Sequence, residues 1–166
     1  FREQKMIEPV PSIYTGPTPA PSLRAGARFL SLMISAACLT VLLIAARLTP
    51  GPAGVATHTQ LGMQECQFLA RTGIPCPSCG MTTSFSLFVR GKILGSFWLQ
   101  PMGAVLAILT SLAFWVALYI AVSGKSIARL VRTIPSRYYL PPLLTWALVA
   151  WGWKIFIHLK GIDGWR

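Results

Sequence analysis

Residues 29–46 of the chain read FLSLMISAACLTVLLIAA, an uncharged and strongly apolar run that lies between Arg28 and Arg47. About 20 predominantly apolar residues allow a helix to cross a bilayer, and long basic side chains at its ends can extend outward to the interface. We therefore expect a first membrane span at about residues 28–48. Cys38 falls inside this span and is interpreted as a membrane-core residue.

Two further apolar segments follow. The interval between Lys92 and Lys125 carries no charged residue, and we place a second span there at residues 102–123. A third span is expected at residues 138–159, where the only charged residue is Lys154 and several tryptophans suit an interfacial aromatic belt. The sequence thus predicts an all-α membrane protein with three transmembrane helices.

Composition supports a membrane protein and excludes other classes. The chain is 54% hydrophobic and only 11% charged, whereas soluble domains have about 25% charged residues. Its 15 Lys and Arg residues outnumber 4 Asp and Glu residues, which gives a net charge of +11. Nucleic-acid binding requires basic residues clustered on one face, but here they are scattered between uncharged runs. We expect no nucleic-acid partner.

The distribution of positive charge predicts the orientation. Basic residues are dense in the tail at residues 1–27 and in the loop between spans two and three, and they are sparser between spans one and two. The positive-inside rule then places the Pro-rich tail in the cytoplasm and the first loop outside. We expect a multi-pass protein of the bacterial inner membrane, with a cytoplasmic N-terminus and a membrane domain at 28–166.

The loop between spans two and three has an apolar spacing of three and four residues, with basic residues interleaved. This pattern is typical of a short helix on an anionic cytoplasmic leaflet, although a solvated basic connector fits so short a segment equally well. The apolar residues are Ile127, Leu130, Val131 and Ile134, and the basic ones are Arg129 and Arg132.

The first loop carries the candidate site. Cys76-Pro-Ser-Cys79-Gly80 is a spacing common in zinc sites, because two thiolates two residues apart can point at one ion. Cys66 supplies a third sulfur, and His58 supplies a nitrogen in the order H-x7-C-x9-C-x2-C. We predict a Cys3His zinc site in a loop at residues 49–84.

Two other interpretations of the same cysteines stay open. Cys76 precedes an expected helix start, where the helix dipole would stabilise a thiolate, so Cys76 and Cys79 also suit a redox-active dithiol. Alternatively, Cys66 forms a structural disulfide with either of the other two, because an outer loop lies in an oxidising compartment.

Residues 80–101 predict two short helices separated by the break at Gly91. Their apolar stripe either lies at the membrane interface or packs on the spans, and we favour packing. Thr82, Thr83 and Ser84 are expected to serve as N-cap and first-turn residues.

The last span contains two ionisable residues, Lys154 and His158, four positions apart on one face. Both are near enough to the end of the span to extend to the interface. His158 is also a second candidate for the fourth ligand, or an axial ligand to a haem or pigment.

The chain resembles a known protein family in the segment that contains the cysteines. The segment TGIPCPSCGMTTSFSLFVRG at residues 72–91, followed by Gln100-Pro101, is similar to a family of small bacterial membrane proteins called domain of unknown function 2752. The resemblance covers about residues 48–158. It implies that Cys66, Cys76 and Cys79 are motif positions, and it implies little about activity.

The sequence contains few residues that could act as catalytic groups. Glu65 is the only acidic residue of the first loop and the spans contain none, so an acid–base pair, a Ser-His-Asp arrangement and a carboxylate relay are all missing. We expect a non-catalytic accessory or assembly subunit of a larger membrane complex, respiratory or photosynthetic. The alternative is a membrane thiol–disulfide oxidoreductase or metal-delivery protein that uses Cys76 and Cys79.

Overall fold

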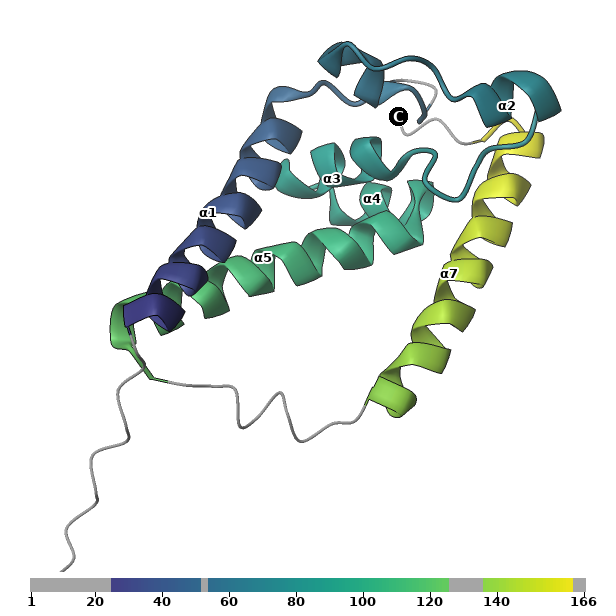
Figure 1. Cartoon of the computed structure of the whole chain (residues 1–166). Coiled ribbons are helices and arrows are strands. Elements are labelled where there is room, and N and C mark those ends of the chain that lie inside the picture. The colour runs from purple at the N-terminus through teal and green to yellow at the C-terminus, as the bar shows by residue number, and fades with distance from the viewer. Residues whose placement is uncertain (1–24, 52–53, 126–135, 163–166) are drawn as a thin grey trace, which may run out of the picture.

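The computed structural model describes residues 25–51, 54–125 and 136–162, with side chains described from residue 140 in the last range. Every element in these ranges is helical, as the sequence predicts (Figure 1). The tail up to residue 24 and the basic segment at 127–134 lie outside the described residues, so the expectations for them stay predictions.

Three helices are long and apolar enough to cross a membrane, and the chain is a multi-pass membrane protein. They are α1 (Ala25–Arg47), α5 (Pro101–Ser123) and α7 (Ser136–Leu159). Each begins and ends within a few residues of the predicted boundaries. The agreement follows from hydropathy, which is a local property of the sequence.

Four short helices connect α1 to α5. They are η1 (Thr57–Leu61), α2 (Gln67–Thr72), α3 (Met81–Val89) and α4 (Ile93–Leu99). The break between α3 and α4 includes Gly91, which has a φ of 76°, so the predicted interruption is confirmed.

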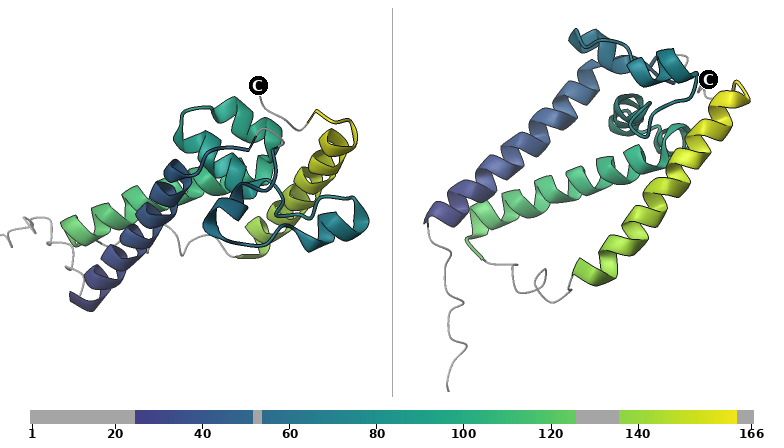
Figure 2. Two further views of the ribbon diagram at one scale, coloured as in Figure 1. Left: turned by 90° about the horizontal axis from the view of Figure 1, so that it is seen from above. Right: turned by 45° about the vertical axis from the view of Figure 1, so that its right-hand side comes forward.

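The short helices α3 and α4 fill a wedge between two spans. α1 and α5 meet near Ala25 and Ser123 and diverge toward their other ends, and α3 and α4 lie in the space between them (Figures 1 and 2). The apolar stripe packs on the spans only in part, because Phe85, Phe88 and Phe97 are half-buried whereas Leu94 and Trp98 are exposed.

Small hydroxyl residues hold this wedge together. Ser84 Oγ and Ser96 Oγ are 2.7 Å apart, and Ser96 Oγ donates to the Ser84 carbonyl at 2.8 Å. Both serines are fully buried. The N-cap of α3 is Gly80, with no side-chain cap, so the expected N-cap role of the hydroxyl residues is wrong, whereas their expected place in the first turn of α3 is confirmed.

Arginines at the ends of helices bind carbonyl groups of neighbouring helices. Arg28 donates from Nε to the Ala121 carbonyl at 3.1 Å, and Arg90 donates from Nη2 to the Ala46 carbonyl at 3.1 Å. The last carbonyls of a helix have no partner within the helix, so these contacts satisfy them. The Arg28 side chain therefore joins α1 to α5.

Replacing Gly103 by alanine should destabilise the wedge. A Cβ at this position would lie 2.9 Å from both Cβ and Oγ of Ser84. We expect Gly103→Ala to lower the free energy of unfolding by about 1–3 kcal/mol, the usual cost of overpacking. Unfolding of the purified protein in detergent, followed by circular dichroism, measures the change.

The matched control is Gly152→Ala in α7, where a Cβ meets nothing within 4 Å. Alanine is the better helix former by up to about 1 kcal/mol, so this variant should be neutral or slightly more stable. Equal destabilisation by both substitutions would contradict the close contact at Gly103.

Candidate metal centre

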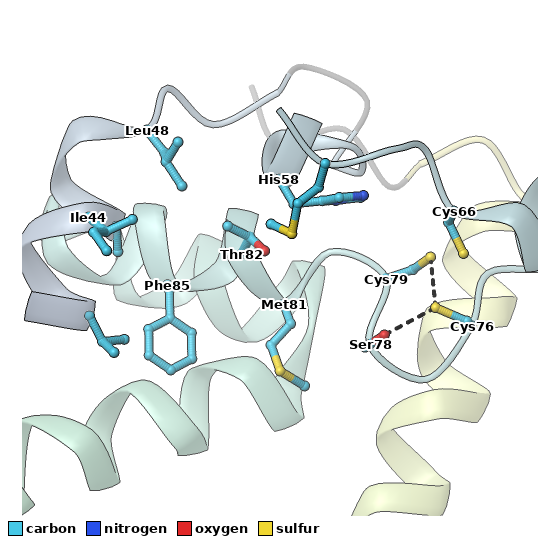
Figure 3. Close-up of a pocket in the computed structure, with 13 residues that line it drawn as sticks. Ile44, Leu48, His58, Cys66, Cys76, Ser78, Cys79, Met81, Thr82 and Phe85 are labelled. Atoms are coloured by element: carbon cyan, nitrogen blue, oxygen red, sulfur yellow. Dashed lines mark hydrogen bonds between the residues drawn. The ribbon is translucent and has the colours of Figure 1, made fainter. Parts of the chain in front are cut away.

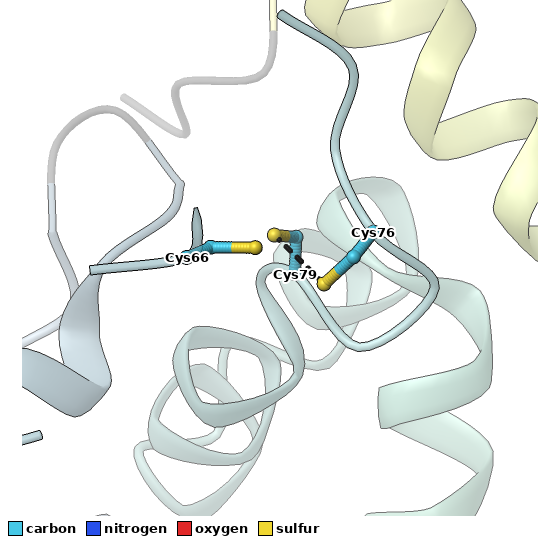
Figure 4. Close-up of side chains that lie close together, drawn as sticks. All are labelled: Cys66, Cys76 and Cys79. Atoms are coloured by element: carbon cyan, nitrogen blue, oxygen red, sulfur yellow. Dashed lines mark hydrogen bonds between the residues drawn. The ribbon is translucent and has the colours of Figure 1, made fainter. Parts of the chain in front are cut away.

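The three cysteines of the first loop converge. Cys66 Sγ, Cys76 Sγ and Cys79 Sγ all lie within 4.8 Å of one another (Figure 4). Cys79 is buried, whereas Cys66 and Cys76 are half-buried. No other group of three or more potential metal ligands occurs among the residues that the structure describes.

A tight turn brings two of these sulfurs together. The Cys79 amide donates to the Cys76 carbonyl at 3.0 Å, and the two Sγ atoms are 3.2 Å apart. Gly80 then adopts a φ of 83° and starts α3. A side chain at Gly80 would also collide with the Gly54 carbonyl, 2.9 Å from an ideal Cβ. Glycine is therefore required here by both backbone conformation and space.

Side chains from two spans support the turn. Trp151 Nε1 of α7 donates to the Pro75 carbonyl at 2.9 Å, and Gln100 Nε2, at the start of α5, donates to the Pro77 carbonyl at 2.8 Å. The sequence predicts neither role. The tryptophans of the last span, Trp151 among them, suit an interfacial belt, and Gln100 belongs to the family motif, but nothing local in the sequence links either residue to the cysteines.

Lys154 differs from its expected placement. Its side chain is fully buried and does not extend to the interface. Lys154 Nζ donates to the Gly54 carbonyl at 3.5 Å and lies close to Gly80. The residue thus connects α7 to both the loop after α1 and the start of α3. These contacts explain why the Lys154 side chain is buried and does not extend to the membrane interface.

The predicted fourth ligand is close to the cysteines but separate from them. His58 borders the same cavity as the three cysteines, and its Nε2 lies 3.1 Å from the Gln64 carbonyl oxygen. His158 is half-buried on α7 and is not one of the clustered ligands. The Cys3His set, and a haem or pigment at His158, remain predictions.

The segment that carries Cys66 has little other support. Helix α2 buries none of its residues, and most of residues 60–74 are exposed. Cys66 immediately precedes α2 and is its N-cap. An ion or a disulfide at Cys66 would therefore add a restraint to a segment that is otherwise tied mainly by the hydrogen bonds between Gln60 and Thr49.

The two cysteines of the turn have opposite pKa shifts. Partial burial raises the pKa of Cys76, but hydrogen bonds with Ser78, Cys79 and Cys66 outweigh it and lower the pKa to about 7. Burial, together with hydrogen bonds to Cys76 and Cys66, raises the pKa of Cys79 to about 12. Cys76 is therefore the thiolate of the pair in the absence of metal.

The donor set suits a soft metal ion. Three thiolates within reach of one another match zinc or copper(I), and no carboxylate of a described residue belongs to the cluster. Bound metal would hold all three sulfurs deprotonated, which overrides the difference in pKa between Cys76 and Cys79.

In reduced, metal-free protein, alkylation of Cys76 should accelerate with pH through a midpoint near 7, because only the thiolate reacts. Cys79 should stay unreactive at pH 9. Ser78→Ala should move the Cys76 midpoint upward, because Ser78 Oγ lies 3.2 Å from the sulfur. Iodoacetamide rates with mass-spectrometric mapping measure both. A Cys76 midpoint near 9 in the unmodified chain would contradict the assignment.

Comparison with known proteins identifies one segment. No curated protein and no solved structure matches the chain. The model of a family described as "Protein of unknown function (DUF2752)" matches residues 66–115. This segment contains the three clustered cysteines, α3, α4 and most of α5. The expected resemblance is thereby confirmed: residues 66–115 of this membrane protein, with their three-cysteine cluster, match the DUF2752 family.

Proposed function

We propose that the protein is a non-catalytic accessory or assembly subunit of a larger membrane complex, respiratory or photosynthetic, whose outer loop is fixed by a metal ion. The observation that carries the proposal is the convergence of Cys66 Sγ, Cys76 Sγ and Cys79 Sγ within 4.8 Å of one another. Zinc is the ion that we favour, because structural zinc sites are rich in cysteine.

The weak packing of the loop supports a structural ion. Residues 60–74 bury little apolar surface, so burial alone supplies little free energy to order them. A structural zinc ion supplies folding free energy directly. His58 borders the same cavity and is the proposed fourth ligand, which it would become by exchanging its contact with Gln64 for the ion.

The exposure of the spans supports a subunit role. The spans cover little of one another, and α7 diverges from α5 toward its N-terminal end (Figure 2). Leu144, Leu148 and Val149 are exposed on that part of α7. Gly152 is also exposed, and a small residue on a lipid-facing surface allows another helix to approach closely.

We propose the bacterial inner membrane as the location, with the N-terminus in the cytoplasm. Positive charge is densest in the tail and in the loop between α5 and α7, which supports this orientation. The cysteine loop and the C-terminal end of α7 then face the outer side together.

Removing the metal should free the loop around Arg71. We expect the purified protein to contain about one zinc ion per chain, and we expect each of Cys66→Ser, Cys76→Ser and Cys79→Ser to lose it. Removing a residue that only hydrogen-bonds to a metal ligand lowers metal affinity by roughly 10- to 100-fold. Removing a ligand itself should lower the zinc affinity by more than this. Elemental analysis measures the metal. Limited trypsin digestion measures cleavage after the exposed Arg71.

The control is Cys38→Ser, which lies within α1 and outside the cluster. It should retain metal and resist trypsin like the unmodified chain. Two results together would contradict the metal proposal. The unmodified protein would be purified without zinc, and a chelator would not change its resistance to trypsin. Comparing trypsin cleavage after Arg71 in right-side-out and in inverted vesicles also shows which face of the membrane carries this residue.

A thiol–disulfide oxidoreductase or a metal-delivery protein is the second candidate. The 3.2 Å separation of Cys76 Sγ and Cys79 Sγ, together with their opposite pKa shifts, supports the redox form. Cys76 is a half-buried thiol of low pKa beside the buried Cys79, and a more accessible low-pKa thiol beside a second cysteine suits an attacking and a resolving cysteine. Protein without metal, in which a reductant rather than a chelator exposes Arg71, would favour this function.

The subunit role predicts a large assembly that depends on the surface of α7. Gly152→Leu should reduce co-migration of the protein with high-mass species on native gels of digitonin extracts, because a larger side chain blocks close helix approach. The control is Ala113→Leu, a similar change at an exposed position of α5. Migration of the unmodified protein at the mass of a single chain would contradict the proposal.

A further inference from the structure

A cavity of about 520 Å³ extends from the three cysteines toward α1. Its apolar walls come from Val41, Ile44 and Leu48 at the end of α1, and from Met81 and Phe85 of α3 (Figure 3). The volume is within the range of roughly 300–1,000 Å³ typical of small-molecule sites. The metal proposal leaves this cavity unexplained, since a bare ion occupies only its cysteine end.

The cavity has an apolar end and a polar end. Ile44, Leu48 and Phe85 lie at one side, and the cysteines with Ser78 lie at the other (Figure 3). His58 and Thr82 lie between them. A ligand that matches this pattern has a long apolar part and a small head that forms hydrogen bonds.

The position of the apolar end indicates where such a ligand comes from. Val41 and Ile44 belong to the transmembrane helix α1, and both are exposed on its surface. The wall of the cavity is therefore continuous with the surface that α1 presents to lipid. A molecule dissolved in the bilayer can reach the cavity without crossing water.

The charge of the lining restricts the head group. Among the described residues, the lining contains no Asp, Glu, Lys or Arg, and His58 is its only ionisable side chain apart from the cysteines. An anionic head would find no Lys or Arg in the lining to pair with, and a cationic head would find no carboxylate, so burying either one is costly. An uncharged head incurs no such cost.

We propose that this cavity binds a neutral membrane lipid, with its chain between α1 and α3 and its small, uncharged head beside the cysteines. Isoprenoid quinones and acylglycerols share this chemistry. The inference goes beyond the proposed subunit function. It holds whether or not the cysteines bind an ion, because the apolar walls come from other residues.

Photo-crosslinking tests the proposal on the full chain in detergent. Three probes carry the same diazirine-labelled C16 chain with a glycerol ester, a carboxylate or a trimethylammonium head. The glycerol ester should label residues 41–48 and 81–85 at least about fivefold more strongly than the other two. Excess decylubiquinone or monoolein should suppress this labelling, and the stronger competitor identifies the type of head group.

Two variants localise the labelling to the cavity. Ala45→Phe fills the cavity from α1, and Ile44→Trp narrows it from an exposed position where folding is less at risk. Both should reduce labelling, whereas Leu112→Phe on the exposed surface of α5 should not. Uniform labelling of all three spans, a preference for a charged head, or unchanged labelling in Ile44→Trp would overturn the proposal. Unmodified protein that contains no metal but still shows this labelling would overturn only the zinc site.

Discussion

Two hydrogen bonds to the cysteine turn, one from α7 and one from the start of α5, organise the end of this protein that carries the cysteines. Trp151 binds the carbonyl before Cys76, and Gln100 binds the carbonyl after it. Backbone carbonyls near the hydrocarbon region need partners, because few waters are available there. By supplying partners from α7 and α5, the fold fixes the turn to both spans, and the positions of Cys76 Sγ and Cys79 Sγ follow.

The same region depends on close backbone approach. Gly80 and Gly54 come so near that no side chain fits at Gly80, and Lys154 reaches between them from α7. Burying an amine is costly unless it has hydrogen-bond partners. The interactions of Lys154 therefore help to set how the C-terminal half of α7 meets the loop after α1. Among the described residues, the N-terminal half of α7 has no side-chain hydrogen bond to α5, and its apolar side chains are exposed instead.

The candidate site is therefore assembled from two kinds of support. The turn with Cys76 and Cys79 is held by hydrogen bonds from Trp151 and Gln100, whereas the segment with Cys66 is largely exposed. An ion or disulfide at this point joins a loosely packed segment to a fixed one. The adjoining apolar cavity has walls from α1 and α3, so the wedge that spreads α1 from α5 also creates the space beside the cysteines.

The sequence by itself determined the three spans, the break at Gly91 and the membership of Cys66, Cys76 and Cys79 in one site. Hydropathy, glycine conformation and cysteine spacing are local properties, and each can be evaluated within a short segment. Only the tertiary structure decided that Lys154 is buried, that Trp151 and Gln100 hold the turn, and that α3 and α4 form a wedge. These features depend on side chains 23 to 100 residues from their partners, and pairing over such separations is fixed by packing of the spans.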